Sequence, residues 1–226
     1  MNDLEVKIEN KINEIRMLIE KINEPSLREK TLYTIEKYLF QPPYIFSPAA
    51  KKAHHSYPGG LIDHLLSTTN IALSIAIQLE KIYGCNIDFD TIISASLLHD
   101  IMKPITYNLE QPDKNSSIGH YLDHLTLSVI KLFQEGFPLK VIHAVAAHHG
   151  EPGPTRPETI EAIIVHLADY IDSKLNGDIL RKARNICQEE LKESPEFNSI
   201  EQVLDIFEKQ KKMLEKAHDE LTASFS

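Results

Sequence analysis

Apolar residues recur every three or four positions across residues 3–40, with one interruption at Pro25. This period matches the α-helix, in which such positions share one face. The pattern predicts two amphipathic helices, and Ser26 is a candidate cap for the second. We assign these helices no chemistry. Their apolar faces comprise Leu4, Ile8, Ile12, Ile15, Leu18, Ile19 and Ile22, then Leu32, Ile35 and Leu39.

A loop and a series of further helices are predicted after residue 40. The stretch 41–60 is rich in proline and ends in paired glycines, which is typical of an extended loop. Residues 61–83 are predicted to form a central, buried helix, because they are apolar almost all round from Ile71 to Leu79. Pro104 is expected to end the next helix near Met102, since proline disfavours helical geometry in the residue before it. Helices are expected at about 90–102, 119–136, 138–149 and 158–175, and two more within 178–221 that separate near Ser194 and Pro195.

The pattern as a whole predicts an all-α fold, a helical bundle with flanking N- and C-terminal helices. The chain has only 8 Gly and no Trp, and its β-branched residues follow helical rather than alternating patterns. A length of 226 residues suits one structural domain. Within it we expect an N-terminal part at 1–53 packed on the core, a core at 54–177 and a C-terminal helical extension at 178–226.

Net charge and cysteine content bear on the substrate class and on the cellular compartment. The net charge of −9 argues against a general grip on nucleic acid, which needs a basic surface, but permits a small phosphorylated substrate held by a metal. Cys85 and Cys187 lie far apart, which favours free thiols of a reducing compartment. The charged N-terminal residues do not resemble a signal peptide, and no run of about 18 apolar residues suggests a membrane helix. We therefore expect a cytoplasmic protein.

The histidines gather in the middle of the chain. Ten of the eleven lie between His54 and His166. Together with two aspartates, they fall near the starts and ends of successive predicted helices. Imidazole and carboxylate donors suit Fe, Mn, Co, Ni or Zn at a site with open positions. The donors exceed what one tetrahedral ion needs, so two ions bridged by a carboxylate are expected. The candidate ligands are His64, His99, Asp100, His120 or His124, His148, His149 and Asp169.

The ordered pattern H…HD…H…HH…D resembles the HD superfamily of metal-dependent phosphohydrolases. The resemblance covers roughly residues 54–175 and includes the phrases HSYPGGLIDH, LLHDIMK, HHGE and LADYIDSK. These phrases are most similar to the HD domain of bacterial 3′–5′ exoribonucleases and of small archaeal and bacterial hydrolases. The exoribonucleases carry an additional β-rich nucleic-acid domain, and nothing β-rich precedes residue 54 here. We therefore do not expect polymeric RNA as the substrate.

The resemblance implies a role for each metal ligand. One ion would be held by His64, His99, Asp100 and Asp169, with Asp100 bridging to the second. His148, His149 and either His120 or His124 would complete the second site. We favour His120, because Gly-His at a helix start resembles the family's phrase, and we keep His124 as the alternative ligand. Relatives usually have Gly where this chain has Met102.

The expected chemistry is attack by metal-bound hydroxide, because a bound ion lowers the pKa of water towards neutrality. Asp100 and Lys103 are the candidate catalytic residues; Lys103 would stabilise charge on the phosphoryl group, or would simply be a solvated lysine at a helix end. His55, Tyr57, Lys103 and Arg156 are candidate substrate-binding residues. Arg156 equally suits a solvated position in its loop.

The function that follows is a metal-dependent phosphohydrolase, with a phosphodiesterase acting on a nucleotide-like or cyclic phosphate as the favoured form. The rich second set of histidines favours two ions and hence phosphodiesters. Three alternatives share the scaffold: a single-metal nucleotidase, a di-iron oxygenase and a protein that senses a nucleotide without turnover. A small phosphorylated substrate and a homo-oligomer are the expected partners.

Overall fold

The computed structural model describes residues 3–111, 114–191 and 196–224. The apolar stripes fold into helices, and the described residues contain no strand beyond one isolated bridge between Tyr107 and Asn115. The all-α prediction is therefore confirmed. The helices are α1 (Asp3–Ile19), α2 (Pro25–Tyr38), α3 (Gly60–Tyr83), α4 (Phe89–Leu98), α5 (Lys103–Thr106), α6 (His124–Gln134), α7 (Leu139–Ala146), α8 (Ile160–Ile186) and α9 (Ile200–Ser224), with 3-10 turns at Tyr44–Phe46 and Ile118–His120 and a π-turn at Cys187–Leu191.

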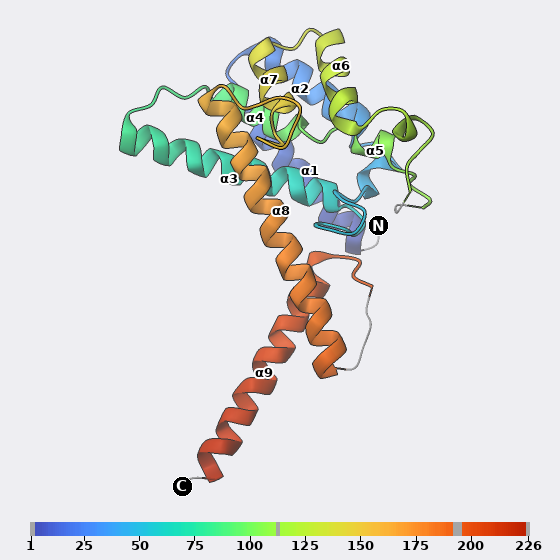
Figure 1. Cartoon of the computed structure of the whole chain (residues 1–226), viewed down its shortest axis with the longest axis vertical. Helices are drawn as coiled ribbons and strands as arrows, with labels where there is room; N and C mark the ends of the chain where they lie inside the picture. The colour runs from blue at the N-terminus through green and yellow to red at the C-terminus, as the bar shows by residue number, and fades with distance from the viewer. Residues whose placement is uncertain (1–2, 112–113, 192–195, 225–226) are drawn as a thin grey trace.

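Helix α3 is the centre of the fold and crosses the body of the protein, packed against α4 and α8 (Figure 1). Its first half is fully buried at Leu61 and Leu65. Helices α1 and α2 belong to the same hydrophobic cluster, through Ile15, Ile19 and Leu27 among others. The N-terminal helices thus form part of the core, because their apolar faces cover α3 and α4.

The second half of α3 is less enclosed than its sequence suggested. Ile77, Ile82 and Tyr83 are exposed, although Ala72 and Ala76 are buried against α4 and α8. By length and composition alone α3 could cross a membrane, although the sequence analysis found no apolar run long enough to suggest a membrane helix. Half of that apolar stretch is buried inside the fold, as in a core helix.

Several helix ends differ from those predicted. Helix α4 ends at Leu98, and Pro104 lies in the first turn of α5, where proline is tolerated because the first N–H groups of a helix have no partner. The cap of α2 is the carboxylate of Glu24 and not Ser26, because it accepts from the N–H groups of Ser26 and Leu27. The predicted break at 194–195 lies outside the described residues.

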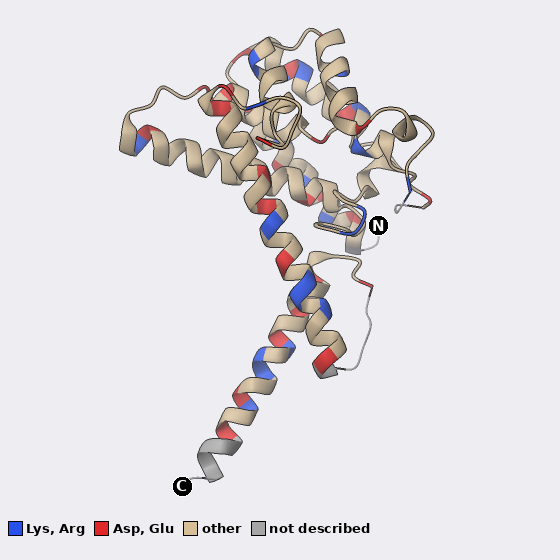
Figure 2. Ribbon diagram, in the orientation of Figure 1, with Lys and Arg blue, Asp and Glu red and all other residues tan. Residues whose placement is uncertain are grey.

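The C-terminal half of α8 and helix α9 extend away from the body (Figure 1). Helix α8 runs far past the predicted end at residue 175, and its last turns pack against α9 through Leu180, Ile186 and Val203. Basic and acidic segments follow one another along the lower part of α8 and along α9 (Figure 2). Cys85 and Cys187 form no disulfide with each other, and Cys187 is buried.

Candidate active site

Four side chains meet where α3, the end of α4 and the middle of α8 come together. The buried His64 Nε2 lies 3.2 Å from Asp100 Oδ2 and 3.2 Å from Asp169 Oδ1. His99 Nε2 lies 3.3 Å from Asp100 Oδ2 and 3.0 Å from His64 Nε2. Two imidazoles and two carboxylates thus converge on one point, and a ligand atom from each of His64, His99 and Asp169 falls within 4.8 Å of the others.

A second group faces the other oxygen of Asp100. It consists of His124 at the start of α6 and the adjacent His148 and His149, which follow α7. His124 Nε2 lies 3.2 Å from Asp100 Oδ1, and His148 Nε2 lies 3.8 Å from the same oxygen. Asp100 therefore stands between two groups of donors, with one carboxylate oxygen directed to each.

In three of the histidine rings, the oxygen atom next to Nδ1 determines which ring nitrogen carries a proton. His99 Nδ1 lies 2.8 Å from the Ser96 carbonyl, and His148 Nδ1 lies 2.7 Å from the Val145 carbonyl. His64 Nδ1 lies 2.7 Å from Asp172 Oδ2. Each of these oxygens accepts only, so each Nδ1 carries a proton and Nε2 is the ring atom that faces inwards.

Two of the atoms that face inwards have no hydrogen-bond partner. Asp100 Oδ1 and His124 Nε2 are buried and form no hydrogen bond with the described residues. Neighbouring carboxylates and imidazole lone pairs would repel one another, and a divalent ion is the species that satisfies all of them at once. The residues present therefore fit the metal that their chemistry implies.

Electrostatics keep the carboxylates ionised. Burial opposes the charge on Asp100, but the ammonium of Lys103 and the imidazoles around it hold the pKa of Asp100 well below its usual range. The pKa of Asp169 is lowered in the same way by His64 and His99, against the effect of burial. Burial lowers the pKa of His148 to about 3, so its ring is neutral and able to bind a metal.

Lys103 is buried and its ammonium contacts Asp100 Oδ2. Burial disfavours its charge, but the Asp100 carboxylate outweighs burial and raises the pKa of Lys103. Lys103 is therefore a fixed positive charge at the edge of the cluster, and not the solvated lysine that was the other interpretation of its sequence position.

The turn that carries His148 and His149 depends on Gly150. Its φ of 67° lies in the left-handed region, and a Cβ there would come within 2.3 Å of the His166 ring. His166 Nδ1 in turn donates to the His148 carbonyl at 2.8 Å. Glycine is required because any side chain would displace the ring that supports this turn.

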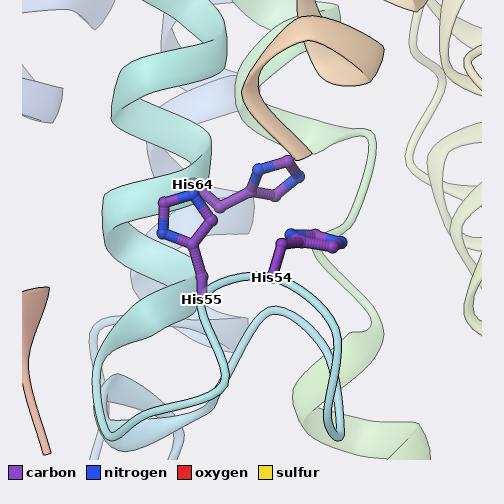
Figure 3. Close-up of side chains that lie close together, drawn as sticks. All are labelled: His54, His55 and His64. Atoms are coloured by element: carbon purple, nitrogen blue, oxygen red, sulfur yellow. The ribbon is translucent and has the colours of Figure 1, made fainter. Parts of the chain in front are cut away.

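His55 and Tyr57 lie behind the cluster. His55 Nε2 is 2.8 Å from Asp172 Oδ2, the oxygen that also holds His64, and His55 Nδ1 is 3.0 Å from the Tyr57 hydroxyl. The Tyr57 hydroxyl donates to Asp63 Oδ2 at 3.0 Å. Figure 3 shows His54 and His55 on the loop before α3, with their rings gathered around that of His64. His55 holds Asp172, which in turn bonds His64, so His55 supports the ring of this candidate ligand.

Two predicted residues lie outside the cluster. His120 is exposed in the 3-10 turn, whereas α6 begins at His124, capped by Asp123, whose carboxylate accepts from the Thr126 N–H. We therefore replace His120 by His124 in the ligand set. Arg156 is 71% exposed in its loop and pairs with Glu151 at 3.1 Å, as expected of a solvated arginine.

Asp172 was missed in the sequence. It follows Asp169 by three positions, a spacing that places both carboxylates on neighbouring parts of one helix face. That spacing was the available signal, because a second aspartate three residues after a candidate ligand on a half-buried helix needs its own partner.

The HD domain family model matches residues 61–174. A dihydroneopterin 2′,3′-cyclic phosphate phosphodiesterase from Methanocaldococcus jannaschii is 43% identical over 183 residues, which cover 76% of this chain and 71% of that protein. The 3′-5′ exoribonuclease YhaM of Bacillus licheniformis is 28% identical over 181 residues, which cover 72% of this chain and 53% of that protein. The chain thus spans about half the length of the exoribonuclease. No solved structure gives a significant match.

The chain belongs to the HD domain family. Membership confirms the family predicted from the histidine pattern and identifies a metal-dependent hydrolase of phosphate esters, with a phosphodiesterase among its relatives. The His and Asp groups described above are the candidate metal site of this hydrolase.

Proposed function

We propose that this protein is a phosphodiesterase that opens the cyclic phosphate of a small nucleotide-like molecule and uses two divalent transition-metal ions. The observation that carries the proposal is the position of Asp100, whose two oxygens face two separate groups of donors. A single-metal nucleotidase has no need for the second group. The M. jannaschii relative, which acts on dihydroneopterin 2′,3′-cyclic phosphate, supports a cyclic substrate.

The proposed ligands divide into two sets. His64, His99 and Asp169 hold the first ion, and His124, His148 and His149 hold the second, with Asp100 shared between them. When bound, such ions lower the pKa of water and neutralise charge on phosphate oxygens. The ring protonation described above suits this role, because His64, His99 and His148 all offer Nε2 as a neutral ligand.

Lys103 is the proposed catalytic residue of the chain itself. Its buried ammonium is positioned by Asp100, so it needs no reorganisation to stabilise the negative charge that builds up on the phosphoryl group. In the reaction the oxygen of water bonds to phosphorus, one ring P–O bond breaks, and the leaving oxygen takes up a proton. The product is a phosphate monoester.

A small substrate suits this chain better than polymeric RNA. The net charge of −9 disfavours long contact with a polyanion. The exoribonuclease relative acts on RNA, but the identity of this chain to the cyclic phosphodiesterase is higher. The two cysteines, which form no disulfide, also fit the cytoplasmic setting that we propose.

Hydrolysis of 2′,3′-cyclic AMP, assayed after purification without chelator and alongside elemental analysis, tests the proposal. We expect about two equivalents of a transition metal and formation of adenosine monophosphate. Asp100→Asn should lower turnover at least about a hundredfold, because the shared charge is lost. His120→Asn is the matched control and should match the wild type. An active Asp100→Asn enzyme, or a wild type that contains metal but cleaves no phosphodiester, would contradict the proposal.

A further inference from the structure

Two hollows lie side by side next to the proposed metal centre. One of about 350 Å³ separates residues 52–53 from α8 and is lined by Lys52, Ser173, Gly177, Arg181 and Arg184 among others. The other, of about 500 Å³, continues past Lys52 and Arg184 towards residues 196–198. Since they share these two side chains, we treat them as one feature and call it the basic groove.

The inner end of the basic groove touches the metal centre. Ser173, which lines the groove, donates to Asp169 Oδ1 at 3.1 Å and lies 3.4 Å from His54 Nε2. His54 Nδ1 is buried and has no hydrogen-bond partner among the described residues. A ligand in the groove therefore lies one side chain away from a proposed metal ligand.

Gly177 keeps the groove open. It lies inside α8, where glycine is about 1 kcal/mol less favourable than alanine. A Cβ at this position would be in contact with the Ala53 carbonyl, 3.9 Å away, and with His54 Cβ, 4.0 Å away. An alanine would fit in ordinary contact, whereas a larger side chain would fill the hollow, so a small residue at this position leaves the groove open.

The groove is positive in an acidic protein. The smaller hollow has four basic side chains, of Lys52, Lys174, Arg181 and Arg184, against the single carboxylate of Asp178. Lys174 and Arg181 both contact the same Asp178 oxygen, at 2.9 and 2.8 Å. Arg184 is half-buried and donates to Ser56 Oγ at 3.4 Å, but forms no ion pair with any described residue. Most of its five donors are available to an anion.

These groups follow one face of α8. Asp169, Ser173, Gly177 and Arg181 are spaced four residues apart, so they lie in a row along the helix. The rise from Asp169 to Gly177 is about 12 Å. The Arg181 side chain covers the turn before its own Cα, which is the turn of Gly177. An anion on Arg181 would thus lie roughly 12 Å from the metal centre.

We infer that the basic groove binds a second phosphate of the substrate, remote from the phosphate that is hydrolysed. The substrate class is then a nucleotide with the cyclic phosphate at one end and a 5′-phosphate or 5′-diphosphate at the other. This inference rests on the proposed function for the position of the first phosphate. Arginine suits the role, because its planar guanidinium binds phosphate through two parallel hydrogen bonds.

Binding without turnover tests the groove directly. Calorimetry with the metal-loaded protein compares adenosine 3′,5′-bisphosphate with adenosine 3′-monophosphate. We expect the 5′-phosphate to tighten binding at least about tenfold, and the gain to shrink with added salt, as for other ion-paired phosphate contacts. The gain should disappear in the double variant Arg181→Gln/Arg184→Gln and persist in Lys182→Gln, an exposed neighbour that lines neither hollow. Equal affinities for the two ligands in the wild type would overturn the inference.

Two further measurements separate this inference from the proposed function. The first compares the hydrolysis of 2′,3′-cyclic AMP with that of its 5′-phosphorylated form. If both are hydrolysed equally well, and the bisphosphate binds no more tightly than the monophosphate, the function stands and the inference fails. If neither nucleotide is hydrolysed but the gain in affinity depends on the arginines, the groove stands and the function fails. Gly177→Leu, which fills the hollow without altering charge, should remove the same gain. A full gain in that variant would contradict the groove as the site.

Discussion

The carboxylate of Asp172 accepts a hydrogen bond from His64 Nδ1 at 2.7 Å and lies 2.8 Å from His55 Nε2 through the same oxygen. This relationship fixes the ring of a proposed metal ligand from behind. His55 is itself held in an unusual conformation, with a φ of 43°, and its backbone N–H donates to the Asn176 side chain at 2.6 Å. His55, on the loop before α3, therefore supports the ring of a proposed metal ligand through Asp172.

Asp172→Asn should weaken metal binding by about ten- to a hundredfold, the usual cost of losing the carboxylate partner of a histidine ligand. The amide oxygen of the new asparagine still accepts one hydrogen bond. The variant lacks the negative charge of Asp172, which makes the His64 ring a better ligand. The measurement is competition with a chelator, followed by elemental analysis.

Asp178→Asn is the control for this variant, because it removes a carboxylate from the same helix that contacts Lys174 and Arg181 but not the histidines. It should retain the metal like the wild type. Unchanged metal affinity in a folded Asp172→Asn protein would show that Asp172 does not support the centre.

His124→Ala should reduce the metal content from about two equivalents to about one, whereas His120→Ala should leave it unchanged. His124 Nε2 is a buried atom without a partner, 3.2 Å from Asp100 Oδ1, and His120 is exposed four residues earlier. Elemental analysis of both variants decides between them. Loss of metal in His120→Ala but not in His124→Ala would show that His120, which the sequence pattern favoured, is the ligand.

The sequence predicted which His and Asp residues follow one another along the chain as candidate ligands. It did not predict where each helix begins or which side chains face the site. Helical periodicity and the ordered histidines predicted that His64, His99, Asp100 and Asp169 belong to one site, and their side chains lie close together. Their role as metal ligands stays a prediction. The choice between His120 and His124 depended on where α6 begins, and the Asp123 cap sets that start one turn later than the glycine suggested. The role of Asp172 depended on a contact with α3, which lies more than a hundred residues away along the chain.

Lys103→Met should lower kcat by about a hundred- to a thousandfold, the usual effect of removing one fixed group that stabilises charge in a transition state. Metal content should stay the same, because the ammonium of Lys103 has no lone pair to offer a metal. Lys81→Met, at the exposed end of α3, controls for loss of a lysine. An unchanged kcat together with a lowered melting temperature would mean that Lys103 only neutralises Asp100.

Gly150→Ala and Gly84→Ala form a matched pair that isolates the support of the His148–His149 turn. Both glycines have a positive φ, 67° and 66°, so alanine adds about 1–2 kcal/mol of backbone strain at either position. A Cβ at Gly84 meets nothing within 4 Å, whereas one at Gly150 comes within 2.3 Å of the His166 ring.

Gly150→Ala should therefore lower the free energy of unfolding by about 1–3 kcal/mol more than Gly84→Ala, the usual cost of overpacking. It should also release metal from the second group of donors, because His166 can no longer hold the His148 carbonyl at 2.8 Å. Denaturant unfolding and elemental analysis of both variants measure the two effects. Equal destabilisation with full metal content would show that the turn holds its shape without His166, and that the histidine pair is positioned by α7 alone.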